Sequence, residues 1–195
     1  MSTTEQYVVA GIGTEVGKTV ISAILVEKLQ ADYWKPIQSG ELDYTDTDKV
    51  REWTSNERSV FHPEAFRLNT PMSPHGAAAI DGVEIKADDF KLPQTDNTLI
   101  VELAGGLMVP FNDQELNIDL VEKWGLPVIL VSHYYLGSIN HTLLSIELLK
   151  ARNIPIKGIV FNGEIVETTK EIILSYSKDT DLGSVGFDQV PSKEM

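Results

Sequence analysis

The nine residues Gly11 to Thr19, "GIGTEVGKT", constrain the fold of this chain more than any other stretch. They follow the apolar run "YVVA" and precede "VISAILVEKL", so a glycine-bearing loop joins an expected strand to an expected helix. The loop ends like a phosphate-binding loop, but the strict pattern G-x-x-x-x-G-K-[ST] needs a glycine where this chain has Ile12. The loop alone leaves three readings open: a nucleotide site with a longer loop, a chance match, or a variant typical of one family.

Short apolar runs recur along the chain and predict the strands of a sheet. They begin at Tyr7, Asp32, Thr98, Pro127, Ile156 and Leu182. Apolar residues at helical spacing lie between several runs, and they are Ile21, Ile24, Leu25 and Leu29 in one segment and Ile139, Leu143, Ile146 and Leu149 in another. This alternation predicts an α/β fold of the P-loop NTPase kind, a mostly parallel β-sheet flanked by helices on both faces.

The length of 195 residues suits one well-buried core and is short for two, so we expect a single domain over residues 1–195. The polar stretch 43–74 is interpreted as an insertion of helix and loop within that domain. Ligands of such a fold gather at the carboxyl ends of the parallel strands.

The charge balance limits the class of partner. Lys and Arg number 16 against 29 Asp and Glu, a formal net charge of -13, so we expect no binding to nucleic acid or to an anionic membrane. Apolar runs such as "PVILV" are too short to span a bilayer, and the polar start "MSTTEQ" predicts no signal peptide. The chain has no cysteine, which excludes thiolate chemistry and fits a cytoplasmic protein.

The phosphate-binding interpretation assigns a role to the end of the loop. Backbone N–H groups and the start of the helix would surround an anion, Lys18 would neutralise the outer phosphates, and the Thr19 hydroxyl would bind Mg²⁺. The alternative is an ordinary turn between a strand and a helix. The strand before the loop and the helix after it favour the phosphate site.

Four further polar residues could carry chemistry. Glu102 lies near the end of "TLIVEL" and could bind Mg²⁺, although a strand-terminal glutamate can also face solvent. Lys35 in "WKPIQSG" could be a second cation for phosphoryl transfer, although a surface lysine is the default. Asp46 and Asp48 could each reach Mg²⁺, although such an acidic run alone is only a solvated loop.

A second glycine turn precedes a helix at "LGSINHTLL". Gly137, Ser138 and Asn140 could offer an anion-binding helix N-terminus, or Ser138 could simply cap the helix. The four histidines are too scattered to indicate a metal cluster, and we assign them no chemistry.

Taken in order, the motifs of this chain resemble those of the dethiobiotin synthetase family. The resemblance runs through "GIGTEVGKT", "KPIQSG", "DTD", "MSPHGAAA", "VELAGGLMVPF", "LPVILV", "LGSINHTLL" and "GIVFN", and it covers nearly the whole chain. That family has the same extra residue in its loop, which explains why the strict pattern fails at Ile12.

The resemblance implies an ATP- and Mg²⁺-dependent ligase of biotin biosynthesis acting on 7,8-diaminononanoate. One amine takes up CO₂ as a carbamate, ATP phosphorylates the carbamate, and the second amine attacks the mixed anhydride to close a cyclic urea. Family members act as homodimers in which the substrate carboxylate reaches a helix N-terminus of the partner chain, and the matching positions here are Gly137, Ser138 and Asn140.

The resemblance also implies the site residues. Lys35 and Lys18 match catalytic lysines, Thr14, Lys35 and Ser39 match substrate contacts, and Thr19, Asp48 and Glu102 match the Mg²⁺ ligands. The remaining positions implied for ATP binding are Glu15, Val16, Gly17, Val20, Leu103, Ala104, Gly105, Asn162, Gly163, Gly186 and Phe187, in addition to Lys18, Thr19, Asp48 and Glu102.

Three residues depart from the family pattern: Gly13 stands where relatives often have Asp, Leu103 replaces a glycine, and Tyr135 replaces a lysine. The loss of that lysine removes a possible positive charge near the substrate.

Two other classes share this fold. Partition ATPases carry a signature lysine that "GIGTEV" lacks. Amidoligase synthetase domains work with a glutaminase part, for which this chain has no cysteine.

Overall fold

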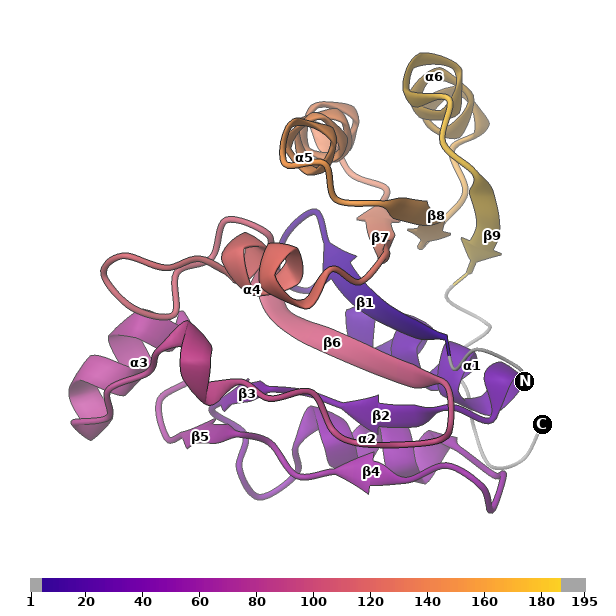
Figure 1. The fold of residues 1–195 in the computed structure, drawn as a ribbon. Coiled ribbons are helices and arrows are strands. Elements are labelled where there is room, and N and C mark those ends of the chain that lie inside the picture. The colour runs from indigo at the N-terminus through magenta and orange to yellow at the C-terminus, as the bar shows by residue number, and fades with distance from the viewer. Residues whose placement is uncertain (1–4, 187–195) are drawn as a thin grey trace.

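The computed structural model describes residues 5–186, and its centre is a parallel sheet of seven strands (Figure 1). In spatial order the strands are β4 (Phe61–His62), β2 (Asp32–Trp34), β6 (Leu99–Gly106), β1 (Gln6–Gly11), β7 (Val128–His133), β8 (Ile156–Asn162) and β9 (Asp181–Val185). Every pairing in this sheet is parallel. The parallel α/β fold predicted from the alternating pattern is therefore confirmed.

Six α-helices and one 3₁₀ turn of residues 5–186 surround the sheet. They are α1 (Lys18–Leu29), α2 (Asp46–Trp53), α3 (Pro74–Asp81), the turn at Ala87–Asp89, α4 (Asn117–Trp124), α5 (Ser138–Ala151) and α6 (Glu167–Ser177). Within residues 5–186, none of these helices has both the length and the apolarity to cross a membrane.

The helices divide into two layers because neighbouring strand residues point to opposite faces of the sheet. Val9 and Tyr33 belong to the core that α1 and α2 cover, whereas Val8 and Val101 belong to the core that α3, α4, α5 and α6 cover. Both faces of the sheet are therefore buried, which agrees with the near-continuous apolar runs of its strands.

The expected strand beginning at Asp32 is broken in two. β2 ends at Trp34, the chain continues through Lys35 and Pro36, and β3 (Ile37–Ser39) then pairs with β5 (Phe66–Leu68) in a separate parallel sheet of two strands. A proline lacks the N–H that a central strand needs, so the break falls where the chain leaves the main sheet. Stretch 43–74 contains α2 as expected but also β4 and β5, whose two and three residues are too short to produce a periodic pattern.

Two apolar residues predicted on buried helix faces are exposed. Leu29 is the last residue of α1 and is 44% exposed, and Ile139 lies in the first turn of α5 and is 38% exposed.

Candidate functional site

The glycine loop connects the carboxyl end of β1 to the first residue of α1, Lys18. Gly17 has a φ of 92°, and a Cβ at this position would lie 2.0 Å from Nδ2 of Asn162, so only glycine fits there. The Nδ2 group of Asn162 donates a hydrogen bond of 3.0 Å to the carbonyl of Val16 and ties the loop to β8. The conformation of the loop thus depends on Gly17 and on the hydrogen bond from Asn162 of β8.

Lys18 is only 6% exposed, and its ammonium group donates to the carbonyl oxygen of Gly13 across the loop at 3.1 Å. Burial lowers the pKa of Lys18 to about 8, because desolvation disfavours the charged form more than Glu102 favours it. A cation is therefore positioned at the mouth of the loop, as the phosphate-binding interpretation requires.

Lys35 lies at the end of β2 and is buried, with 6% of its surface exposed, so it is not a surface lysine. Its Nζ lies 3.1 Å from Oε1 of Glu102 and also forms an ion pair with Asp46. Burial alone would lower the pKa of Lys35, but the two carboxylates outweigh it and raise the pKa above its ordinary value. The pairing with Glu102 and Asp46 thus favours the charged form of Lys35.

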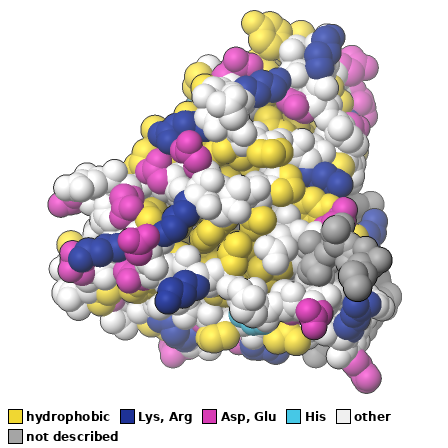
Figure 2. Space-filling model, in the orientation of Figure 1, with side chains coloured by type: hydrophobic (Ala, Val, Ile, Leu, Met, Phe, Trp, Pro, Cys, Tyr) yellow, Lys and Arg dark blue, Asp and Glu magenta, His cyan; other side chains and the backbone are white. Residues whose placement is uncertain are grey.

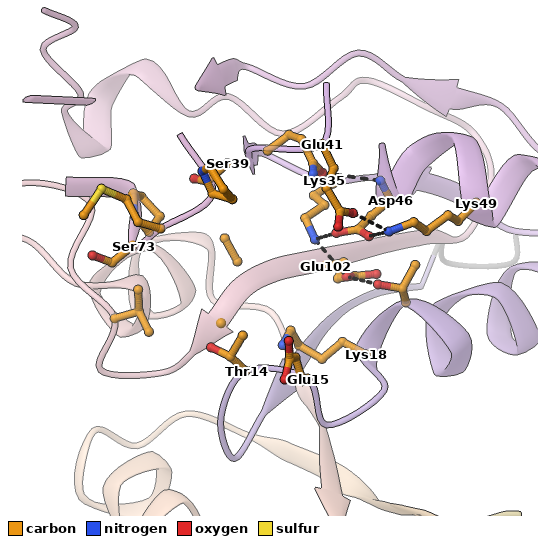
Figure 3. Close-up of a pocket in the computed structure, with 18 of the residues that line it drawn as sticks. Thr14, Glu15, Lys18, Lys35, Ser39, Glu41, Asp46, Lys49, Ser73 and Glu102 are labelled. Atoms are coloured by element: carbon orange, nitrogen blue, oxygen red, sulfur yellow. Dashed lines mark hydrogen bonds and ion pairs between the residues drawn. The ribbon is translucent and has the colours of Figure 1, made fainter. Parts of the chain in front are cut away.

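Glu102 is fully buried in β6 and does not face solvent. Its Oε1 accepts a hydrogen bond of 2.9 Å from the Thr19 hydroxyl besides the one from Lys35, and its Oε2 accepts one of 3.0 Å from the Tyr33 hydroxyl. Burial, followed by the charge of Glu102, raises the pKa of Tyr33 well above its ordinary value, so this phenol remains a donor. Residues from a strand, a helix and a loop thus meet at one carboxylate. Figure 3 shows the Lys35 side chain directed toward Glu102.

The two aspartates of the "DTD" run lie differently. Asp46 is the first residue of α2 and pairs with Lys35 and with Lys49, whose Nζ is 3.1 Å from Oδ1 of Asp46. Asp48 instead completes the capping box of α2, accepts from the backbone N–H of Thr45 at 3.0 Å and pairs with Arg51. The structure brings Asp46 into the site, and it uses Asp48 to cap the helix.

Lys18, Lys35, Asp46 and Glu102 border a cavity of about 700 Å³, shown in Figure 3. Predicted site residues that line it are Thr14, Glu15, Gly17, Lys18, Thr19, Lys35, Ser39, Glu102, Ala104 and Gly105. The buried Ser39 hydroxyl has no hydrogen-bond partner among the described residues, so it can meet a ligand. Ten residues chosen from scattered motifs thus converge on one space.

Nine further residues line the cavity that were not among the predicted site residues. They are Gln38, Glu41, Asp46, Lys49, Pro71, Met72, Ser73, Pro74 and Val109. Of these, Asp46 is the alternative to Asp48 that the sequence leaves open, and "MSPHGAAA" contains Met72, Ser73 and Pro74. Nothing in the sequence signalled Glu41 or Lys49, which pair at 2.7 Å across the cavity wall.

Several other predicted residues lie outside the cavity lining. Val16, Val20 and Leu103 are not among the lining residues, and Asn162, Gly163 and Gly186 lie at the carboxyl ends of β8 and β9. Phe187 lies outside the described residues. Gly137, Ser138 and Asn140 form the start of α5, away from the cavity of their own chain.

A cation such as Mg²⁺ prefers oxygen ligands, and the site offers the carboxylates of Glu102 and Asp46 with the hydroxyl of Thr19. Within the described part of the chain, no three His, Asp or Glu side chains form a group that could hold a metal by themselves. The donor set therefore fits a hard cation that takes further oxygens from a phosphate.

Comparisons with known proteins agree with this geometry. The family model described as an AAA domain matches residues 5–193. The chain is 52% identical over 194 residues to the ATP-dependent dethiobiotin synthetase BioD of Christiangramia forsetii, a match that covers 97% of this chain and 93% of the relative. It is 47% identical over 192 residues to the protein of the same name from Cytophaga hutchinsonii, with coverages of 98% and 93%.

A solved ParA family ATPase from Chlorobium tepidum has a TM-score of 0.53 and 12% sequence identity to this chain. The match covers 96% of this chain and 86% of that one. At such low identity the likeness supports the fold alone.

Proposed function

The chain belongs to the dethiobiotin synthetase family, and on this premise we propose that it carboxylates 7,8-diaminononanoate with CO₂ and ATP and closes the urea ring of dethiobiotin. It is an ATP-dependent ligase of biotin biosynthesis. The observation that carries this function is the convergence of Lys18, Lys35 and Glu102 on one cavity beside the glycine loop. An ATP-dependent carboxylation gathers several oxyanions in one place, and such a site needs fixed cations.

The proposed reaction divides the work between the two lysines. One amine of the substrate adds to CO₂ to form a carbamate, and the carbamate oxygen attacks the γ-phosphorus of ATP with release of ADP. Lys18 meets the phosphates of ATP, and Lys35 meets the charge on the carbamate and the transferring phosphoryl group. Lys35 is paired with the carboxylates of Glu102 and Asp46, so we assign it to the stabilisation of charge.

Ring closure follows when the second amine attacks the carbonyl carbon of the mixed anhydride. The C–O bond to phosphate breaks, phosphate leaves with the electron pair, and the attacking nitrogen loses its proton. The ammonium group of Lys35 can stay close to the departing phosphate throughout, since it is fixed by Glu102 and Asp46. Correct placement of both amines supplies most of the rate advantage of such a step.

Mg²⁺ is proposed to bind Thr19, Glu102 and Asp46, with Asp46 in place of Asp48. When bound, the ion would neutralise charge on the phosphates of ATP. The support for Asp46 is its position on the cavity wall, whereas Asp48 is occupied at the N-terminus of α2.

The remaining contacts are proposed from the family pattern and the cavity. Thr14 and Ser39 contact the diamine, and both line the cavity. Residues proposed around the nucleotide are Glu15, Val16, Gly17, Lys18, Thr19 and Val20 at the phosphates, Leu103, Ala104 and Gly105 beside them, and Asn162, Gly163, Gly186 and Phe187 near the base.

Dependence on ATP supports a cytoplasmic location. On the face drawn in Figure 2, Lys and Arg lie interspersed with Asp and Glu, which supports small molecules rather than nucleic acid or membrane as partners.

A homodimer is proposed to complete the substrate site. Leu136 is fully exposed, and Tyr135 and Ile139 beside it are 41% and 38% exposed, so an apolar surface surrounds the start of α5. Gly137, Ser138 and Asn140 lie there and do not line the cavity of their own chain. A partner chain would cover the apolar side chains and present this helix N-terminus to the substrate carboxylate.

The activity is tested by measuring release of ADP with ATP, Mg²⁺, 7,8-diaminononanoate and bicarbonate, and then omitting each component in turn. We expect turnover to require all four and dethiobiotin to form in proportion to ADP. Turnover that is indifferent to the diamine would overturn the proposed function.

The dimer is tested by mixing two inactive variants, Lys35→Ala and Asn140→Asp, under conditions in which subunits exchange. Half of the dimers are then hybrids with one intact site of two, so about a quarter of the wild-type activity should return. A mixture that exchanges subunits and stays inactive would show that the site does not span the interface.

A further inference from the structure

The hydroxyl of Tyr33 reaches the carboxylate at the centre of the site from inside the protein core. Tyr33 is fully buried in β2 and is not among the residues that line the cavity. It pairs with Ile100 across the strands, and Glu102 lies two residues further along β6 on the same face. A diagonal neighbour of this kind is within reach of a tyrosine side chain, and the oxygen of Tyr33 is 3.0 Å from Oε2 of Glu102.

The two oxygens of Glu102 have different surroundings. Oε1 accepts from Thr19 at 2.9 Å and from Lys35 at 3.1 Å, which are both cavity residues. Oε2 accepts from Tyr33, which lies behind the carboxylate. The terminal torsion of a glutamate is soft, so a donor on one oxygen fixes the direction of the other.

The ring of Tyr33 is itself immobilised. It belongs to the core that α1 covers, and its centroid lies 6.4 Å from that of Phe61 on the neighbouring strand β4. A rigid ring can hold a carboxylate in one orientation, whereas a flexible donor would follow the carboxylate as it moved.

We propose that Tyr33 is a positioning residue, whose phenol holds the carboxylate of Glu102 with Oε1 directed toward Thr19 and Lys35. This inference rests on the proposed function, because it assigns Glu102 to the cation that accompanies ATP. Outer contacts of this kind affect metal affinity by about 10–100-fold when they are removed.

The test is Tyr33→Phe, which removes one oxygen and keeps the ring. Binding of a non-hydrolysable ATP analogue is measured by calorimetry at increasing Mg²⁺, together with turnover and the melting temperature. We expect the Mg²⁺ concentration for half-maximal binding to rise about tenfold. Turnover at saturating Mg²⁺ should fall by about three- to tenfold, and the protein should remain folded.

Tyr7→Phe is the matched control. Tyr7 is 5% exposed, packs in the same core and also donates to a glutamate, Glu5, at 2.7 Å. Its hydroxyl does not touch a cavity residue, so its removal should leave Mg²⁺ dependence and turnover unchanged. Equal Mg²⁺ dependence in Tyr33→Phe and Tyr7→Phe would overturn the proposal, even if Tyr33→Phe melted at a lower temperature.

A second comparison tests whether Tyr33 acts through Glu102. In a Glu102→Gln background, Tyr33→Phe should change Mg²⁺-dependent binding by less than twofold, because the carboxylate that it orients is gone. A tenfold effect that persisted in this background would overturn the proposal. The proposed function has a separate test. If wild-type turnover did not depend on the diamine while Tyr33→Phe still weakened Mg²⁺-dependent binding, the proposed function would be overturned and the role of Tyr33 would be retained.

Discussion

Asp32 and Glu102 are two buried carboxylates of the same parallel sheet, and they differ in what surrounds them. Asp32 begins β2, is 2% exposed and lies level with Leu99, three residues before Glu102 along β6. Its oxygens accept from the backbone N–H of Val60 at 3.0 Å, from Asn97 at 3.0 Å and from Thr95 at 2.7 Å, and they contact His62 at 3.2 Å. These groups come from surrounding loops and strands, and Asp32 is closed off by them.

Glu102 is equally buried but borders a cavity, and one of its partners is the ammonium group of Lys35. A buried carboxylate is costly unless donors or cations compensate for the lost water. At Asp32 the compensation comes from the donors of Val60, Thr95 and Asn97, which join separate segments of the chain. A lysine and a hydroxyl at the cavity provide it at Glu102 and leave the same groups available to a ligand. Asp32 in β2 and Glu102 in β6 are thus compensated in two ways, the first by a closed set of donors and the second by groups that border a cavity.

The largest effect on turnover is expected from Lys35→Ala, which removes the ammonium group that pairs with Glu102. Turnover should fall by about 10²–10³-fold at saturating substrates, because charge on the reacting carbamate and phosphoryl group loses its partner. Lys18→Ala should weaken binding of ATP and turnover together. The measurement is steady-state kinetics with analogue binding and circular dichroism, and full turnover by Lys35→Ala would remove this lysine from the reaction.

The next effect concerns stability. Asp32→Ala should lower the free energy of unfolding by about 2–3 kcal/mol, because it leaves several buried donors without an acceptor, while turnover of the folded protein stays within about twofold of wild type. Denaturant unfolding and kinetics measure the two quantities. A variant that unfolds normally but loses activity would break the contrast with Glu102.

The same variant carries a pH dependence. Burial would raise the pKa of Asp32, but its hydrogen bonds from Thr95, Val60 and Asn97 outweigh burial and lower the pKa below the ordinary value of 3.8. The contribution of Asp32 to stability is therefore present above pH 3.8 and is lost as the pH falls through the lowered pKa. Wild type and Asp32→Ala should converge in stability in acid, and a constant difference down to pH 2 would contradict this.

A smaller effect separates the two aspartates of α2. Asp46→Asn should raise the Mg²⁺ concentration for half-maximal activity by about tenfold, because it weakens an oxygen ligand and a partner of Lys35. Asp48→Asn is the matched control, and it should change Mg²⁺ dependence by less than about twofold while slightly weakening the helix cap. The reverse ranking in a Mg²⁺ titration would return Asp48 to the ligand set.

The smallest effect is expected at a third carboxylate, Glu27, which is held by neutral donors but lies nearer the surface. Hydrogen bonds from Ser55, first, and Asn56 lower its pKa to about 2. Glu27→Gln should lower the melting temperature by about 2 °C at pH 7. The difference should shrink as the pH falls below 4.5 and be lost below about pH 2, where the carboxyl group of the folded wild type is also protonated. Scanning calorimetry at several pH values measures it.

The sequence alone determined the main elements of this site. The loop that ends in Lys18 and Thr19 follows an expected strand, and Lys35 and Glu102 lie toward the ends of two others. Because the carboxyl ends of parallel strands share one edge, residues in such positions must meet, and the structure places them around one cavity. The motifs that contain these residues also indicated the dethiobiotin synthetase family, and the similarity to known relatives confirms that family.

Only the tertiary structure decided which aspartate enters the site and what holds Glu102 in place. Asp46 and Asp48 are two residues apart on α2, so they point to nearly opposite sides of the helix, and only the packing of α2 on α1 fixes which side faces Lys35. Tyr33 reads in the sequence as one apolar position of a strand, and its bond to Glu102 depends on the register of β2 against β6. Helix rotation and strand register are properties of pairs of elements, so no single segment of the chain could specify them.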